Sequence, residues 1–348
     1  MKILRFCLVL LAASVVVAAC ASPTPEVERK LKVGVVVDAG SELDKSFNEF
    51  TLKGASEAAQ AAGFDFIYVS PQSSSDYERS IVDLIATENP NLVITVGFRM
   101  GDATARVAQK HPEIHFAIMD NAYYPGAGCA ENVTNCYSEE GGLSNVTSLM
   151  FAEDEIGYLA GVLAACMSRS GKIASVAGVE IPPVVRFVTG YQNGARSIDP
   201  DIVLFNQYVP DFNDPATGHV VAQDFISQGA DVIFGAAGNT GNGALLAAHE
   251  YGAKAIGVDV DQYYTYPDVR SSLITSASKN VDVAASAAVR DFAAGKLAPG
   301  IRVANLSNGG VGLAPYHDWD SRIPQDCKDL VVSAEELLKT NPAITGAK

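Results

Sequence analysis

The sequence predicts an α/β protein built from two doubly wound lobes, each with a parallel sheet, joined by a hinge. Short runs rich in Val, Ile and Ala alternate with longer segments whose apolar residues recur at helical spacing. Strands separated by about 10–15 helical residues are typical of βαβ units and hence of parallel sheets. The same alternation restarts after Asp154, and 348 residues suffice for two domains of ordinary size. Two lobes are therefore favoured over one oversized sheet.

The first lobe is expected to begin with a buried strand at residues 32–37, because this run is β-branched and contains only one charged residue. A helix follows from Phe47, and Gly63 ends it. The expected strands of this lobe are 32–37, 64–69, 92–96 and 115–119, and the expected helices are 47–62, 74–88 and 103–110.

The second lobe repeats the pattern. Its expected helices are 156–168, 184–198, 215–228 and 242–251, and its expected strands are 172–177, 202–206, 231–234 and 255–258. A strand at 273–276 and a helix at 281–294 are expected to lead back to lobe one, and the chain from Ile301 to cross again. Lobe one thus comprises 31–147 and 277–300, and lobe two 148–276 and 301–348. Several short crossings would form a hinge suited to closure around a ligand.

The amino terminus has the features of an export signal. Lys2 and Arg5 precede an apolar run at 8–19, which is too short to span a bilayer comfortably. The run ends in Val17-Ala-Ala-Cys20, which resembles the lipobox of bacterial lipoproteins. The resemblance implies cleavage after residue 19, lipid on Cys20, a polar tether at 20–30 and attachment to the extracytoplasmic face of the membrane by the lipid alone. The alternative is an ordinary cleaved signal with an incidental cysteine.

The charge balance argues against nucleic acid as a partner. Asp and Glu number 40 against 25 Lys and Arg, a net charge of −15, and such a surface repels phosphate backbones. Simple solubility explains this acidity. We expect no metal and no cofactor, because the histidines show no ligand spacing with one another or with the cysteines; they are His111, His115, His219, His249 and His317.

Four cysteines remain in the body once the signal and the lipidated residue are set aside. An even number in an oxidising compartment suggests disulfides. Cys129 and Cys136 flank six residues in a Gly/Pro-rich loop and are expected to close it. Cys166 and Cys327 then pair by elimination.

Candidate ligand-binding residues follow the strands, because open parallel sheets bind ligands outside the carboxyl ends of their strands. Carboxylates there can accept hydrogen bonds from amines or diols, and an aromatic ring can stack on a ring of the ligand. In lobe one and at the hinge the candidates are Asp38, Phe47, Asn48, Asp120 and Lys279. In lobe two they include Asp259 and the small-residue stretch 235–243 with Gly238, whose backbone N–H groups a ligand could approach.

Each candidate also has a structural interpretation. A strand-end Asp often caps the next helix, Phe47 alone suits a core, and the glycine-rich stretch alone suits a turn, since it lacks the Lys-Ser/Thr of a P-loop. The joint occurrence of these residues at carboxyl ends in both lobes favours a shared ligand site.

Four motifs resemble the basic membrane protein family, whose nucleoside-binding members are called purine nucleoside receptor proteins. They are Asp38-x-Gly-x-x-x-Asp-Lys-Ser-Phe-Asn48, Asp231-Val-Ile-Phe-Gly-Ala-Ala-Gly-Asn-Thr-Gly241, Gly257-Val-Asp-Val-Asp-Gln262 and Thr275-Ser-x-x-Lys279. The likeness covers 31–315. It implies the type I periplasmic binding protein fold and a lipid-anchored substrate-binding protein, working with the permease and ATPase subunits of an ABC transporter. We expect a monomer.

The resemblance also implies roles for single residues. Phe47 matches the first ring that stacks on the purine, and the second is expected from lobe two, either Phe187 or Phe212. Asp38 and Asp120 match polar positions of the first lobe, while Asp259 and Lys279 resemble the pair that binds the ribose hydroxyls. Family members often have a polar residue after the first Asp, where this chain has Ala39.

The expected ligand is a purine nucleoside: adenosine, guanosine or inosine. A nucleotide is disfavoured because its phosphate would meet several carboxylates and one lysine. The alternatives are a binder of a sugar or another small solute, and a receptor component that signals to a membrane partner. An exported enzyme is disfavoured and no catalytic residue is expected, because the sequence suggests neither a Ser–His–Asp arrangement nor an Asp cluster of the nucleoside hydrolase kind.

Overall fold

The computed structural model describes residues 30–38 and 41–347. The predicted signal, the lipobox with Cys20, most of the tether and Ala39 lie outside the described residues. Leu31–Lys348 forms one compact unit. Among the helices described, none combines the length and the apolar character needed to cross a membrane.

The first lobe contains a six-stranded sheet in the order β13-β7-β4-β3-β1-β2. All of its strand pairs are parallel. Helices cover it, so its inner strands are largely apolar, as in other buried parallel sheets. The strands are β1 Lys32–Val36, β2 Asp65–Val69, β3 Leu92–Thr95, β4 His115–Met119, β7 Val146–Phe151 and β13 Gly300–Ala304. The helices are α1 Phe47–Ala61, α2 Tyr77–Glu88, α3 Gly101–Lys110 and α9 Val281–Ala293.

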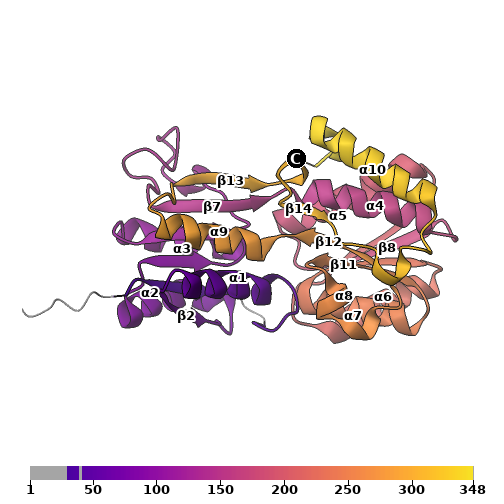
Figure 1. The fold of residues 1–348 in the computed structure, drawn as a ribbon, viewed down its shortest axis with the longest axis horizontal. Coiled ribbons are helices and arrows are strands. Elements are labelled where there is room, and N and C mark those ends of the chain that lie inside the picture. The colour runs from indigo at the N-terminus through magenta and orange to yellow at the C-terminus, as the bar shows by residue number, and fades with distance from the viewer. Residues whose placement is uncertain (1–29, 39–40, 348) are drawn as a thin grey trace, which may run out of the picture. The chain divides into compact units, whose positions relative to one another are not determined.

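The second lobe contains another six-stranded sheet, in the order β14-β12-β11-β10-β8-β9, parallel except for β14. Its strands are β8 Lys172–Ala177, β9 Val203–Tyr208, β10 Val232–Ala236, β11 Lys254–Asp259, β12 Leu273–Lys279 and β14 Val311–Leu313. Its helices are α4 Glu153–Met167, α5 Pro182–Ile198, α6 Pro215–Ser227, α7 Gly238–Glu250, α8 Gln262–Thr265 and α10 Gln325–Thr340. Figure 1 shows the two sheets side by side, with late segments α9 and β13 lying among the early elements of lobe one.

The chain crosses between the lobes three times, from β7 to α4, from β12 to α9 and from β13 to β14. The crossings are bonded to one another: Ala152 N–H donates to the Ala304 carbonyl at 2.9 Å, and Leu306 N–H donates to Glu155 Oε2 at 2.9 Å. The expected lobe boundaries at 147/148 and 300/301 fall inside β7 and β13, both of which belong to the sheet of lobe one. The crossings therefore follow the carboxyl ends of these strands.

The glycine-rich stretch after β10 is not a turn. It forms the first turns of α7, which begins at Gly238 and not near 242. The glycines allow α6 and α7 to pack closely: a Cβ on Gly218 would lie 1.9 Å from the Thr240 carbonyl oxygen, and one on Gly243 would lie 1.9 Å from that of Pro215. Close helix packing, which the local sequence does not reveal, explains the composition.

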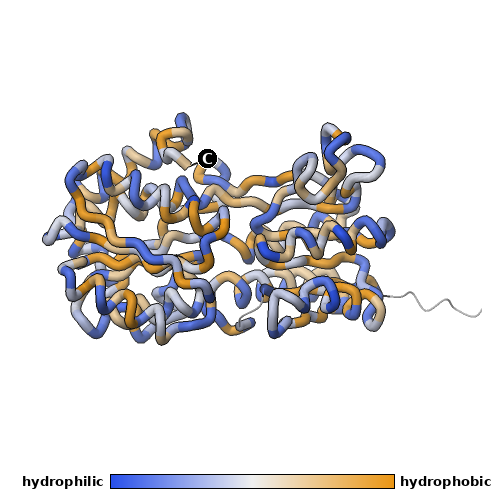
Figure 2. Tube along the Cα trace, turned by 180° about the vertical axis from the view of Figure 1, so that it is seen from behind, coloured by the Kyte–Doolittle hydropathy of each residue, from blue (hydrophilic) through white to orange (hydrophobic). Residues whose placement is uncertain are grey.

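Apolar residues are concentrated in the strands of both lobes, as Figure 2 shows. One buried cluster extends from Val33 in β1 to Phe234 in β10, so the core continues from one lobe into the other. The four cysteines of the body stand in two bonded pairs. Cys166 and Cys327 join α4 to α10 with a Cα–Cα distance of 5.7 Å, and Cys129 and Cys136 close the loop after β4.

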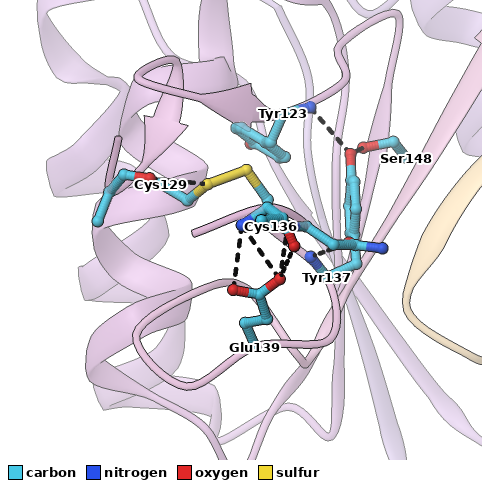
Figure 3. Close-up of a disulfide and its surroundings, with 9 residues drawn as sticks. Tyr123, Cys129, Cys136, Tyr137, Glu139 and Ser148 are labelled. Atoms are coloured by element: carbon cyan, nitrogen blue, oxygen red, sulfur yellow. Dashed lines mark hydrogen bonds between the residues drawn. A yellow bond between two sulfur atoms is a disulfide. The ribbon is translucent and has the colours of Figure 1, made fainter. Parts of the chain in front are cut away.

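Two tyrosines attach this small loop to the sheet (Figure 3). Tyr123 N–H donates to the Tyr137 hydroxyl at 2.9 Å, and that hydroxyl lies 2.7 Å from Ser148 Oγ in β7. The loop starts directly after Asp120 and Asn121, so it is built onto one corner of the site described next.

Candidate functional site: a cleft between the lobes

A cavity lies between the two lobes and is lined by residues of both. Its walls come from the carboxyl ends of strands in both sheets. The structure brings all nine residues predicted to bind the ligand to these walls: Asp38, Phe47, Asn48, Asp120, Phe187, Phe212, Gly238, Asp259 and Lys279.

At one corner Asp38, which follows β1, is held by two lobe-one side chains. Arg99 Nη2 donates to Asp38 Oδ1 at 2.9 Å, and the Tyr77 hydroxyl donates to the same oxygen. The Arg99 guanidinium also lies 5.5 Å from the ring centre of Phe212, across the cleft. Sequence reasoning missed Arg99, although it follows β3 at the carboxyl edge and the strand-end rule could have found it.

The loop before α1 is organised by Asp44, another buried residue missed from the sequence. Its carboxylate accepts backbone N–H groups from Ser46 at 2.9 Å, Asn48 at 2.9 Å and Glu49 at 3.2 Å. Burial raises the pKa of Asp44 to about 7, in spite of these bonds, which lower it. The Asn48 amide donates to the Ser41 carbonyl at 3.2 Å, so Asn48 shapes this loop as well as lining the cavity.

Lys279, at the end of β12, is the buried cation of the site and is 2 % exposed. Its Nζ lies 4.9 Å from the ring centre of Phe47, 4.8 Å from that of Phe151 and 5.9 Å from that of Phe187. Cations over aromatic faces are attracted by the ring quadrupole. Burial acts to lower the pKa of Lys279, but nearby carboxylates, Asp120 first, raise it above its ordinary value.

Asp120 and Asp259 occupy equivalent places at strand ends in the two lobes. Both have left-handed backbone conformations, with φ of 63° and 64°. Such strain in non-glycine residues is concentrated at functional sites. Asp120 Oδ2 accepts from Lys279 Nζ at 2.6 Å, while its buried Oδ1 accepts no hydrogen bond from the described residues. Burial raises the pKa of both carboxyls.

The two candidate rings of lobe two differ in their surroundings. Phe187 is 4 % exposed and packs edge-on against Phe234, with the ring centres 6.0 Å apart. Phe212 is half-buried. Its carbonyl accepts the Thr240 N–H at 3.1 Å, which ties it to the first turn of α7. The ring of Phe212 is therefore more exposed than that of Phe187, which packs into the core.

Sequence reasoning also missed a buried ion pair beside Lys279. Glu153, the first residue of α4, has a fully buried side chain. Its Oε1 lies 2.9 Å from Lys279 Nζ, and its Oε2 accepts from Arg186 Nε at 2.8 Å. A residue that follows β7 could have been found by the strand-end rule, had the strand been predicted.

Comparisons with known proteins agree with this architecture. Residues 30–337 match the family described as ABC transporter substrate-binding protein PnrA-like. The ABC transporter nucleoside-binding protein BmpA of Lactococcus lactis is 30% identical over 336 residues, covering 90% of this chain and 91% of that protein. Basic membrane protein A2 of Borrelia garinii is 35% identical over 252 residues, covering 72% and 69%.

Solved structures give the same result for the fold. The solute-binding protein of an ABC transporter system from Aeropyrum pernix has a TM-score of 0.79 and 27% identity, covering 90% of this chain and 92% of that one. The two α/β lobes therefore form the type I periplasmic binding fold, as expected. The chain belongs to the PnrA-like family of ABC transporter substrate-binding proteins.

Proposed function

We propose that this protein captures a purine nucleoside in the interlobe cavity and presents it to the permease and ATPase of an ABC transporter. The observation that carries the proposal is the buried Asp120–Lys279–Asp259 group, which faces the same cavity as the rings of Phe47 and Phe212. The relative from Lactococcus lactis, whose name describes it as nucleoside-binding, supports this ligand class.

In the proposed complex the base lies between Phe47 and Phe212. Phe47 comes from the start of α1 in lobe one and Phe212 from the loop before α6 in lobe two, so a ring between them would be gripped by both lobes. Base–aromatic stacking contributes about 1–3 kcal/mol per base. Arg99 contacts both Asp38 and the ring of Phe212. Asp38 would therefore lie near the base and could accept hydrogen bonds from its edge.

The ribose is assigned to the other end of the cavity. An ammonium has three N–H donors; Lys279 donates one to Asp120 at 2.6 Å, and its Nζ forms an ion pair with Glu153 Oε1 at 2.9 Å. An N–H group of the ammonium is then available to a ribose oxygen. Asp120 Oδ1 and the Asp259 carboxylate would accept the protons of the two hydroxyls. A neutral vicinal diol satisfies this set of donors and acceptors, whereas a phosphate would face the carboxylates of Asp120 and Asp259 beside a single lysine.

The proposal includes export and lipid attachment at Cys20. Relatives from Pyrococcus furiosus and Pyrococcus abyssi carry the word lipoprotein in their names. Two or more acyl chains form a stable anchor, because each buried methylene contributes about 0.8 kcal/mol. Ligand binding would favour the closed arrangement of the lobes, and that population shift is what the permease would detect.

Calorimetry tests the ligand assignment. The protein is unfolded, dialysed to remove any retained solute and refolded, and is then titrated with adenosine, guanosine, inosine, the free bases and ribose. We expect one-to-one binding of at least one nucleoside, with no product after prolonged incubation. Binding of ribose or another sugar in preference to every nucleoside would contradict the proposal and favour a sugar carrier.

A further inference from the structure

We propose that Glu153 is a positioning residue for ligand recognition, which holds the Lys279 ammonium in place for the ribose end of the cavity. The identity of the ligand in this inference rests on the proposed function. The contacts of Glu153 are independent of that function. Glu153 does not line the cavity, but its ion-pair partner Lys279 does, so we assign its effect on binding to this contact.

Glu153 is placed by the fold between two cations of different character. Lys279 is only 3 % exposed as a side chain and forms an ion pair with Glu153 Oε1 at 2.9 Å, whereas Arg186 is 21 % exposed and donates a hydrogen bond to Oε2 at 2.8 Å. A buried carboxylate needs such partners, because an unpaired charge in the interior costs several kcal/mol. Arg186, on α5, therefore offsets part of the buried negative charge of Glu153, and Glu153 in turn offsets the buried positive charge of Lys279.

The ion pair also fixes where the ammonium points. Asp120 alone would leave two N–H groups of Lys279 free to rotate among the surrounding rings. The Glu153 carboxylate, 2.9 Å from Lys279 Nζ, attracts the ammonium from the start of α4 and so restricts its position. Glu153 stands one residue beyond the crossing from lobe one, and Lys279 ends the strand before the second crossing. The contact thus links the ligand site to two of the three hinge segments.

A matched control lies two residues away. Glu155 is in the same helical turn and is also buried, but its Oε2 accepts the Leu306 N–H at 2.9 Å. It contacts the third crossing, whereas the described ion pairs of Lys279 are with Asp120 and Glu153. Glu155→Gln and Glu153→Gln make the same chemical change two residues apart. A general effect of neutralising a buried carboxylate at the start of α4 should therefore appear in both variants.

The first measurement needs no ligand. The reaction of the Lys279 amine with acetic anhydride is followed against pH by mass spectrometry of its peptide, in wild type, Glu153→Gln and Glu155→Gln. Because Glu153 is one of the carboxylates that raise the pKa of Lys279, Glu153→Gln should shift the half-reaction down by about one pH unit. Glu155→Gln should react as wild type. An unchanged profile in Glu153→Gln would overturn the proposal.

The second measurement compares ligands. Glu153→Gln should weaken nucleoside binding about tenfold, because the ammonium loses the ion-pair partner that restricts its position, while the affinity for the free base stays within about twofold. Equal losses for nucleoside and base would mean that Glu153 only supports the fold. If Glu153→Gln is poorly folded, Glu153→Gln/Arg186→Gln removes both charges together and should show the same selective loss.

The two proposals fail in different ways. A wild-type protein that binds no nucleoside contradicts the proposed function and leaves the acylation profile to decide the role of Glu153. A wild-type protein that binds nucleosides, with Glu153→Gln binding them equally well, contradicts the positioning role alone.

Discussion

Ser46 and Asp259 are 213 positions apart in the chain, yet Ser46 Oγ donates a hydrogen bond of 2.7 Å to Asp259 Oδ2 across the cleft. Two further bonds join the same loop to lobe two: Asn242 Nδ2 donates to the Asp44 carbonyl at 3.1 Å, and Thr265 Oγ1 donates to the Lys45 carbonyl at 2.9 Å. The loop before α1 therefore makes several polar contacts between lobe one and lobe two outside the hinge. Phe47 follows this loop directly, as the first residue of α1.

Ser46→Ala should accelerate ligand release. The variant loses one buried cross-cleft hydrogen bond, worth about 1 kcal/mol, so the open arrangement becomes more populated and the dissociation rate should rise about fivefold in stopped-flow measurements. Ser56→Ala is the control, because Ser56 lies on α1 and bonds only to the Lys53 carbonyl of its own helix. Equal release rates for the two variants would argue against this role of Ser46.

Replacing the rings one at a time separates ligand contact from core packing. Phe47→Ala and Phe212→Ala should each weaken nucleoside binding about tenfold or more, because each loses a stacking contact of about 1–3 kcal/mol. Phe187→Ala should instead lower the free energy of unfolding by about 3–5 kcal/mol, because it leaves a cavity in the core. Calorimetry and urea unfolding on all three variants check this. A stable Phe187→Ala with lost affinity would make Phe187 the second stacking ring.

Asp259→Ala should weaken the binding of nucleosides more than that of free bases, since the carboxylate is assigned to the ribose. We expect at least a tenfold loss for the nucleoside and less than a twofold loss for the base in parallel titrations. Asp261→Ala is the matched control: Asp261 is two residues away, pairs with His317 at 2.7 Å and does not line the cavity. Equal loss of both ligands in Asp259→Ala would remove the ribose assignment.

The contribution of Asp44 to the stability of the protein should fall as pH rises toward neutrality. The pKa of Asp44 is about 7 in the folded protein against an ordinary value of 3.8, so between these values the folded state binds a proton that the unfolded state has released. Its stabilising contribution is fully present below about pH 4 and is lost as pH rises through 7. Asp44→Asn should flatten the change in Tm between pH 5 and pH 8. An unaltered pH profile in this variant would contradict the assignment.

Removing the Cys166–Cys327 bond should cost stability and leave binding intact. The bond closes a loop of 161 residues in sequence separation, and disulfides typically contribute about 2–4 kcal/mol. Both cysteines lie in helices of lobe two, outside the cavity walls. Cys166→Ser/Cys327→Ser should therefore lower Tm with nucleoside affinity within about twofold. The unreduced protein without residues 1–20 should show no free thiol after denaturation; detectable thiol would contradict the pairing.

Much of the fold was readable from local pattern. Buried parallel strands such as β1 and β8 have continuous apolar runs, and helices such as α5 have clear starts and stops, so their positions were predicted to within a few residues. β7, β13 and β14 were not predicted. Their sequences contain polar or small residues because they lie at the hinge or at a sheet edge, where neighbours supply the stability that local propensity does not.

The sequence by itself determined which side chains stand at strand ends, and the geometry of parallel sheets makes those positions candidates for ligand binding. It thereby identified Asp38, Asp120, Asp259 and Lys279. Only the tertiary structure decided their partners. Arg99, Glu153 and Ser46 reach those residues from other strands or from the opposite lobe. Contacts between segments distant in the chain depend on how the sheets and lobes pack, and no local pattern encodes that packing.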